Sequence, residues 1–389
     1  MGRKKKILDP DTSFERFFWV NLKLLEGLGL FSRKFRLSGR LVNTNTRTVL
    51  PVLFSVSQMV FLMVCEFRAF RRFWTTDADL AITVFTTLVP GALCIFKVRN
   101  GLRLWMCQVE LRELLIDLAI LWEKSRFQVN VQQRTLKIAE RTRYVGSWYL
   151  GMVIFIATCY GMRPYLRKPS EIYDYSVTGM PTMYPFSIDT SAKYLACINW
   201  EMFIAFLLGL YSAASDTMFA QLVSHLAIQY QVILRILKIS GHSEPRFISR
   251  RFVVHCKTIE AIYRPIIFGT MVSTAVTMCF CALSAITDGN HEEVVKNVAH
   301  LVAIVGQSMI YCGYADNLTD QNLKIAQAAY QCHWIERSNN FKSNLQIIMM
   351  RAQKYYCLSG FGFFQLTLAQ ITAIINTTMS YFTLLKTLT

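Results

Sequence analysis

The chain has 389 residues, of which 53% are hydrophobic and 13% aromatic, and its mean hydropathy is +0.30. Soluble domains rarely combine so much apolar and aromatic surface, so the composition favours a polytopic membrane protein and argues against a soluble enzyme. The net charge of +17 lies between apolar segments rather than in one block. This distribution is typical of a membrane topology signal and argues against a nucleic-acid partner.

The chain begins with a basic stretch, residues 1–47, which lacks the leading apolar core of a secretory signal. Six apolar windows long enough to cross a bilayer follow within residues 48–315, and a seventh lies within residues 359–389. The sequence therefore predicts an all-α polytopic membrane protein with seven transmembrane helices. The windows are 48–67, 80–96, 144–160, 194–218, 266–286, 294–315 and 361–385.

Two of the predicted spans have a proline inside them or directly before them. Pro90 lies inside the short second window and predicts a kinked or partly shielded helix. Pro265 precedes the fifth window, and we expect it in the first helical turn, where a missing amide proton has no consequence.

The distribution of Lys and Arg predicts the orientation of these spans. Residues 1–47 and the connections 97–143, 219–264 and 316–358 hold 33 of the 42 Lys and Arg, and the opposite side holds 9. The positive-inside rule then places the N-terminus in the cytosol and the C-terminus outside the cell. This orientation is the reverse of that of a G-protein-coupled receptor.

The three long connections on the cytosolic side show helical periodicity. Apolar residues recur at helical spacing from Leu111 to Trp122, and those from Leu222 to Leu234 continue the fourth span. Residues 316–358 contain two further amphipathic faces and are interpreted as cytosolic anchor helices. We expect these helices to pack as a bundle below the membrane; the alternative is that they lie on the lipid surface.

The last window is apolar but interrupted by amides and hydroxyls, among them Gln370 and Asn376. A helix that lines an aqueous path needs such groups, whereas a lipid-facing helix does not. Residues 359–389 are therefore predicted to form a pore-lining helix, the alternative being a helix packed inside the bundle. Gly360 and Gly362 precede this helix and are expected to give it flexibility.

Recognisable catalytic, nucleotide-binding and metal-binding motifs are absent from the sequence. It has no Walker, Rossmann or HExxH pattern, and its 11 cysteines form no CxxC pair. Scattered Ser, His and Asp residues form no recognisable nucleophilic site. The sequence predicts that the protein is not an enzyme and needs no cofactor or metal.

Several loose motifs together resemble the insect odorant receptors over the whole chain. The most specific is the ending, Leu358–Ser359 followed by Ser-Tyr-Phe-Thr-Leu-Leu at residues 380–385. The stretch Tyr-Cys-Gly-Tyr at residues 311–314, with Asn317 and Trp334, fits the exit of the family's sixth span. Pro164, Pro181 and Pro185 fit its outer loop. The chain does not match the ending of the related gustatory receptors. Those receptors have Gln-Phe at the positions where this chain has Thr387 and Leu388.

The resemblance implies a function, an assembly and a location. Residues 219–264 leave no room for the long insertion of the family's co-receptor, so the chain looks like a ligand-tuned subunit. Such a subunit would join odorant co-receptor subunits in a heteromeric, tetrameric, non-selective cation channel. The channel would lie in the plasma membrane of a sensory neuron dendrite and open when a small volatile ligand binds. A metabotropic chemoreceptor and a membrane transporter for a small apolar substrate are the alternatives.

The resemblance also assigns a gate. The hydrophobic gate of the family falls on Leu384, and its polar ring falls on Thr387. A ring of apolar side chains can block ions by dewetting a narrow passage. The same helical stripe contains Ser380, Asn376 and Thr377. The alternative is that Leu384 packs against a neighbouring helix.

Aromatic and methionine-rich faces in the outer halves of the spans are candidates for the ligand site. Apolar walls with a few polar groups suit volatile ligands, although aromatics on membrane helices are also ordinary packing residues. Glu201 lies inside the fourth window and needs a partner, so it is interpreted either as structurally paired or as ligand-facing. The candidates are Phe85, Trp148, Gly151, Met152, Phe155, Tyr194, Ile198, Glu201, Met202, Ile304 and Gln307.

Overall fold

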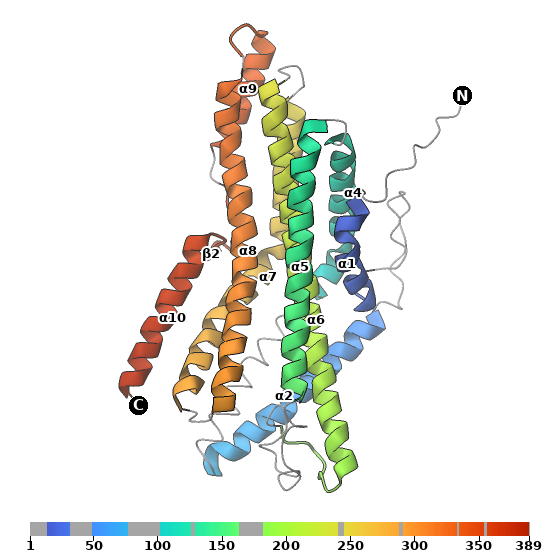
Figure 1. The fold of residues 1–389 in the computed structure, drawn as a ribbon, viewed down its shortest axis with the longest axis vertical. Helices are drawn as coiled ribbons and strands as arrows, with labels where there is room; N and C mark the ends of the chain where they lie inside the picture. The colour runs from blue at the N-terminus through green and yellow to red at the C-terminus, as the bar shows by residue number, and fades with distance from the viewer. Residues whose placement is uncertain are drawn as a thin grey trace, which may run out of the picture.

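A computed structural model describes residues 14–31, 49–76, 102–125, 129–162, 182–239, 245–287, 291–332, 334–353 and 356–388. Its regular structure in these ranges is helical apart from one two-stranded hairpin, which confirms the predicted all-α class (Figure 1). The predicted second span, 80–96, lies outside the described residues. The labelled elements are α1 (Phe14–Gly27), α2 (Val49–Thr76), α4 (Gln108–Ser125), α5 (Val129–Met162), α6 (Ser191–Ile239), α7 (Pro245–Thr287), α8 (His291–Gln331), α9 (Asn339–Ala352), β1 (Ser359–Gly360), β2 (Phe364–Gln365) and α10 (Leu368–Leu388).

Three helices run along most of the long axis of the molecule in Figure 1. α6, α7 and α8 have 49, 43 and 41 residues. At about 1.5 Å per residue they are roughly 60 to 75 Å long, whereas the hydrocarbon core of a bilayer is about 30 Å thick. Each helix therefore continues well beyond a membrane. The predicted extension of the fourth span through Leu222 and Leu226 is part of α6 and is confirmed.

Four of the described helices are long and apolar enough to cross a membrane by length and composition. They are Leu50–Arg72, Ser191–Val232, Val253–Cys279 and Val298–Gln331. These stretches overlap the predicted first, fourth, fifth and sixth spans. The predicted third and seventh spans lie within α5 and α10.

Pro265 does not open a helix. It lies inside α7, which begins twenty residues earlier at Pro245. A proline in a helix interior leaves the carbonyl four residues earlier without its usual amide donor. Here that carbonyl belongs to Ala261, and it accepts a hydrogen bond from Arg103 Nη2 at 3.2 Å. The expectation of a helix start was wrong because a side chain from outside the helix replaces the missing donor.

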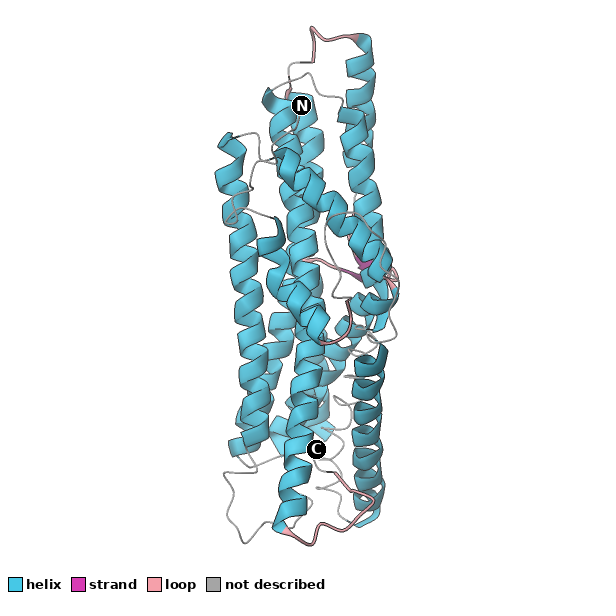
Figure 2. Ribbon diagram, turned by 90° about the vertical axis from the view of Figure 1, so that its right-hand side faces the viewer, coloured by secondary structure: helices cyan, strands magenta, loops and turns pink. Residues whose placement is uncertain are grey.

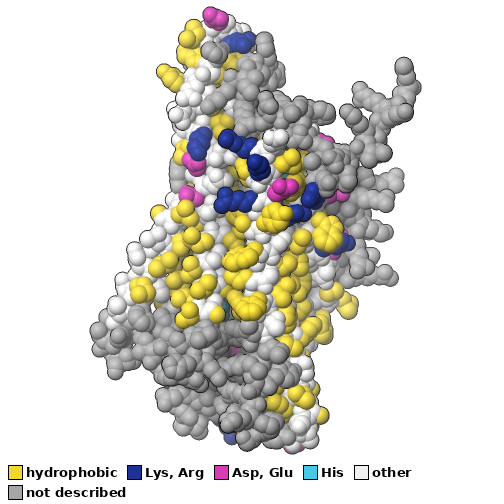
Figure 3. Space-filling model, in the orientation of Figure 1, with side chains coloured by type: hydrophobic (Ala, Val, Ile, Leu, Met, Phe, Trp, Pro, Cys, Tyr) yellow, Lys and Arg dark blue, Asp and Glu magenta, His cyan; other side chains and the backbone are white. Residues whose placement is uncertain are grey.

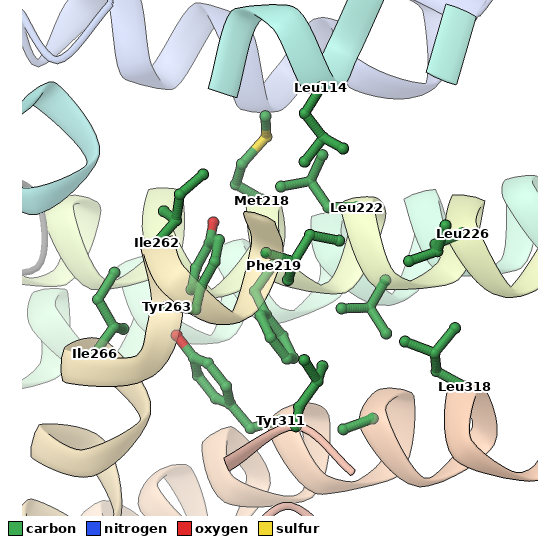
Figure 4. Packing of buried hydrophobic residues seen from close by; sticks show 14 of the residues in the cluster. Leu114, Met218, Phe219, Leu222, Leu226, Ile262, Tyr263, Ile266, Tyr311 and Leu318 are labelled. Carbon is green, nitrogen blue, oxygen red and sulfur yellow. The ribbon is translucent and has the colours of Figure 1, made fainter. Parts of the chain in front are cut away.

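The main hydrophobic core lies where α4, α6, α7 and α8 meet (Figure 4). Phe219 on α6 stacks on Tyr311 of α8, with 4.6 Å between the ring centroids, and contacts the Tyr263 ring of α7 edge-on at 5.0 Å. Leu114 of α4 is buried in the same cluster. The predicted cytosolic helix around Leu114 is therefore packed against the bundle, as expected for a bundle rather than for helices spread on lipid.

The surface changes character along the long axis. On the face shown in Figure 3, Lys and Arg gather in the upper half, and apolar side chains cover the surface immediately below. α5 shows the change within one helix: Lys137 and Arg141 are exposed in its first half, and Trp148 and Phe155 are exposed in its second half. This pattern fits a helix that leaves an aqueous region and enters a membrane.

A short hairpin separates α9 from α10 near the middle of the long axis (magenta in Figure 2). Ser359 pairs with Gln365, and Gly360 pairs with Phe364. A Cβ atom on Gly360 would lie 2.9 Å from the backbone nitrogen of Phe268, and Gly362 has a φ of +80°. The two glycines are thus required by close packing and by a left-handed turn. Their expected role in flexibility stays a prediction.

Candidate ligand site and terminal helix

The predicted ligand residues lie on three helices that pack against one another, α5, α6 and α8. Tyr194 and Ile198 of α6 are buried, as is Ile304 of α8, while Met202 is half-buried. Phe85 lies outside the described residues. The structure thus brings the α6 and α8 candidates into the interior of the bundle.

The candidates on α5 are more exposed. Trp148 is 69% and Phe155 is 68% exposed, and Met152 is half-buried. Gly151 is exposed, and no atom lies within 4 Å of the position that its Cβ would take. The space beside Gly151 on this face of α5 is therefore open among the described residues.

Gln307 belongs to a hydrogen-bond network around Asp216, a residue that sequence reasoning missed. Asp216 lies on α6 and is 1% exposed. Gln307 Nε2 and the Tyr149 hydroxyl donate to its Oδ2 at 2.6 and 2.8 Å, and the Tyr311 hydroxyl donates to Oδ1 at 2.7 Å. One carboxylate thereby joins α5, α6 and α8. Hydrogen bonds to a charged group contribute about 1.5–3 kcal/mol each, so this network is a strong link between the three helices.

Glu201 is hydrogen-bonded to other residues of the bundle. This agrees with the interpretation that it is structurally paired rather than ligand-facing. Its Oε1 accepts hydrogen bonds from Thr182 Oγ1 at 2.9 Å and from the Tyr184 hydroxyl at 2.6 Å. Both donors come from the segment before α6. Burial, followed by the charge of Glu201 and this hydrogen bond, raises the pKa of Tyr184 above its ordinary value. The Tyr184 hydroxyl therefore remains a hydrogen-bond donor at any physiological pH.

Glu201 is not the only carboxylate buried in an apolar window. Glu66 of α2 is 1% exposed and interacts electrostatically with Glu201. Glu66 and Asp216 both lie within predicted spans, 48–67 and 194–218, so a search for charges inside those windows would have found them. Singling out Glu201 alone was wrong.

The terminal helix α10 has two different faces. Ile371, Ile374 and Thr378 are buried, and α10 packs against α7 and α8. On the other side Asn376, Thr377 and Ser380 are exposed. The Thr377 and Ser380 hydroxyls donate to the carbonyls of Ala373 and Asn376 at 2.8 and 2.9 Å. The predicted polar stripe of α10 therefore faces away from the other described helices of the chain.

The two predicted gate residues, Leu384 and Thr387, lie near the end of α10. The described residues do not include their side chains, so their role stays a prediction. The helix register alone places Leu384 four residues after Ser380, on the same face as the exposed polar stripe.

A carboxylate holds the segment that leads into α10. Glu260 of α7 accepts hydrogen bonds from the Tyr356 hydroxyl at 2.9 Å and from Ser359 Oγ at 3.1 Å. The Tyr356 carbonyl in turn accepts a hydrogen bond from Thr319 of α8 at 3.2 Å. These contacts fasten the base of the terminal helix to α7 and α8. Among the described residues, no group of three or more His, Cys, Asp or Glu could hold a metal ion.

Long helices with an apolar surface in the lower half and Lys and Arg on the surface of the upper half define a polytopic helical membrane protein. Comparison with solved structures identifies the fold more closely. The chain superposes on the insect olfactory receptor OR5 from Machilis hrabei with a TM-score of 0.80 and 15% identity, covering 97% of this chain and 99% of that one. The same receptor in complex with eugenol matches with a TM-score of 0.77 over 96% and 100% of the two chains.

Sequence comparison identifies the family. A family model described as 7tm Odorant receptor matches residues 79–379, so the chain belongs to the odorant receptor family. Odorant receptor 47a of Drosophila melanogaster is 23% identical over 66% of this chain and 69% of its own length. The odorant receptor coreceptor of Harpegnathos saltator is 26% identical over 30% of this chain and 24% of its own length. A receptor of this family is not an enzyme, as the sequence indicated.

Proposed function

We propose that this chain is the odorant-binding subunit of a ligand-gated, non-selective cation channel that it forms with co-receptor subunits, as a heterotetramer. The observation that carries the proposal is the exposed polar stripe of α10, which includes Asn376 and Ser380. α10 has 21 residues, and about 20 residues cross a bilayer. A helix of this length with a polar face needs water or another subunit on that face. A shared central pore supplies both.

The proposal places the N-terminus in the cytosol and the C-terminus outside, in the plasma membrane of a sensory neuron dendrite. The count of Lys and Arg supports this orientation, as does the gathering of cationic side chains at one half of the molecule (Figure 3). In this orientation the α5, α6 and α8 candidates lie toward the outer side. A volatile ligand reaches them from outside, and Leu384 closes the pore at the outer end of α10.

Ligand binding is coupled to the pore through packed helices. α8 carries Ile304 and Gln307 of the candidate ligand wall and also packs against α10. A ligand that binds the open arrangement better shifts α8, and with it α10, toward that arrangement. The relevant quantity is the difference in affinity between the two states rather than the total affinity.

Binding itself is expected to be weak. A volatile of about ten heavy atoms at about −0.5 kcal/mol per atom gains roughly −5 kcal/mol, which corresponds to a Kd in the high-micromolar range. The eugenol complex of the Machilis hrabei receptor is a complex with a ligand of this size class.

The test is expression in oocytes with and without an insect co-receptor, under a panel of volatiles. The proposal predicts an odorant-evoked cation current in the co-expressing cells and none with this chain alone. A response that persists after ion conduction is abolished and that requires G proteins would support the metabotropic alternative instead. Substrate uptake driven by an ion gradient, without channel current, would support the transporter.

A further inference from the structure

Two exposed cationic side chains share one face of α7 near Pro265. The spacing of the residues places on one helical stripe Lys257, Ala261, Arg264 and Phe268. The first three are exposed, whereas Phe268 is half-buried. Lys257 and Arg264 are seven residues apart, which is about 10 Å along the helix axis. Both cations therefore lie on the N-terminal side of Phe268, within reach of one small headgroup.

Arg103 adds a third cation between these two. Its Nη2 donates to the Ala261 carbonyl at 3.2 Å, so its guanidinium lies beside the exposed stripe. Its Nε has no hydrogen-bond acceptor among the described residues. A guanidinium with donors left over suits the oxygens of a phosphate group.

One carboxylate pairs with this group of cations. Glu260 Oε1 lies 3.5 Å from Arg264 Nη2, and the same carboxylate accepts the hydrogen bonds from Tyr356 and Ser359. In the described part of the chain, no acidic side chain pairs with Lys257 or with Arg103. Three cations and one carboxylate leave an excess of positive charge. The exposed surface here therefore favours an anion.

Exposed aromatic rings lie next to the cations. Phe361 and Phe363 of the hairpin are 51% and 77% exposed, and their ring centroids lie 5.8 and 6.0 Å from that of Phe268. Phe361 has a φ of +54°, which bulky residues seldom adopt. The turn thus holds two phenylalanines outward, an arrangement that water disfavours and the apolar part of a bilayer favours.

The hairpin lies close to the level at which the surface changes character. Figures 1 and 3 share one orientation, and β2 in Figure 1 lies near the level where Lys and Arg give way to apolar side chains in Figure 3. Along α7, Arg264 precedes Phe268 by one turn, so cations, aromatic rings and apolar surface follow one another. A phospholipid has the same order of charged headgroup and acyl chains.

We propose that Lys257, Arg103 and Arg264 bind the headgroup of an anionic phospholipid, with Phe361 and Phe363 at the level where its acyl chains begin. The expected class is a glycerophospholipid with a net negative headgroup, such as phosphatidylserine. The leaflet that supplies it rests on the proposed orientation, since anionic lipids concentrate on the cytosolic side. Binding itself requires neither a current nor a co-receptor, so this inference and the channel proposal fail independently.

The test measures lipid binding to the purified full chain in detergent by native mass spectrometry. The probes are dioctanoyl-phosphatidylserine and dioctanoyl-phosphatidylcholine, which have the same acyl chains and differ in net charge. We expect the first to bind about tenfold more tightly, as an excess of cations near a membrane surface predicts. Equal affinities would overturn the proposal. O-phosphoserine carries the headgroup without the chains, and displacement of the lipid by an equal concentration of it would indicate a site for soluble anions instead.

Variants assign the effect to this surface. Lys257→Gln and Arg264→Gln should each weaken phosphatidylserine binding about fivefold and leave phosphatidylcholine binding unchanged. Lys324→Gln is the matched control, an exposed lysine of α8 that already pairs with Asp320, and should change neither. A preference for phosphatidylserine that survives in the Lys257→Gln, Arg264→Gln double variant would overturn the assignment.

Phe363→Ser tests the hairpin and should weaken binding of both lipids, because it removes an apolar contact without changing the charge. Size-exclusion chromatography of the same variant checks the other possible occupant of this surface, a second copy of the chain. A changed oligomeric state with unchanged lipid binding would make the hairpin a contact between subunits and would overturn its role in the lipid site.

Discussion

Arg103 Nη2 donates a hydrogen bond at 3.2 Å to the carbonyl of Ala261, the carbonyl that Pro265 leaves without an amide donor. The two partners are far apart in sequence, and the bond joins the short helical turn at residues 102–106 to the middle of α7. Another part of the bundle thus supplies the hydrogen-bond donor that Pro265 removes, and α7 continues through this position as one helix.

We expect Arg103→Met to lower the stability of the protein by about 1 kcal/mol, the usual net contribution of one hydrogen bond. In a Pro265→Ala background the helix regains its own amide donor, and the same Arg103 substitution should have a smaller effect. The melting temperatures of the four proteins in detergent form a double-mutant cycle. Strict additivity of the two substitutions would show that Arg103 does not act through the Ala261 carbonyl.

Asp216→Ala should destabilise the protein by about 3 kcal/mol or more, because the Tyr149, Gln307 and Tyr311 donors would each lose a buried acceptor. Asp216→Asn keeps one carbonyl oxygen and should have a smaller effect. Thermal unfolding monitored by size-exclusion chromatography measures both. Asp320→Ala on α8 is the control, since the Asp320–Lys324 pair is exposed and such pairs contribute about 0–1 kcal/mol. Equal losses at positions 216 and 320 would refute the network.

Gly360→Ala should destabilise the hairpin that precedes α10, because its Cβ would meet the Phe268 backbone at 2.9 Å. Backbone atoms cannot move aside as a side chain can, so we expect a loss of about 1–3 kcal/mol. Gly313→Ala on α8 is the matched control: nothing lies within 4 Å of its Cβ position, and alanine favours a helix. The unfolding temperature should fall for the first variant and hold or rise for the second. Similar unfolding temperatures for the two variants would mean that the hairpin can shift to accommodate the added methyl group at little cost.

Leu384→Ala should raise the leak current or shift the ligand sensitivity of the co-expressed channel, because a smaller side chain weakens a hydrophobic gate. Current recorded without ligand, and the dose–response curve with ligand, test this. Thr372→Ala provides a comparison on an exposed position near the other end of α10. If neither leak nor sensitivity changes in Leu384→Ala, Leu384 packs against a neighbour instead of facing the pore.

The helical architecture could be predicted from the sequence because apolar windows and helical periodicity are local signals. The continuation of the fourth span through Leu222 and Leu226 illustrates this, since α6 runs without a break from Ser191 to Ile239. Pro265 shows the limit. Its position suggested a helix start, and the donor that replaces its amide lies on Arg103, which local sequence cannot reveal.

The polar groups of the candidate site were predicted less well. Gln307 was chosen for its place on a helical face, and its actual partner Asp216 comes from another helix. The partners of Glu201 come from the segment before α6, whose proximity depends on tertiary folding. Spacing along one helix identifies which residues share a face, whereas pairing across helices requires the three-dimensional arrangement.

α8 runs from the candidate ligand wall at Ile304, past the bonds of Gln307 and Tyr311 to Asp216, to Thr319, which holds the Tyr356 carbonyl. No break interrupts the helix between these points. In the proposed channel, an unbroken helix of this kind would transmit displacement like a lever, with the Asp216 network as its fulcrum. A small tilt at the ligand end would then become an opposite tilt at the segment that leads into α10. Ligand preference can then diversify at one end of the lever while the machinery at the other end stays the same.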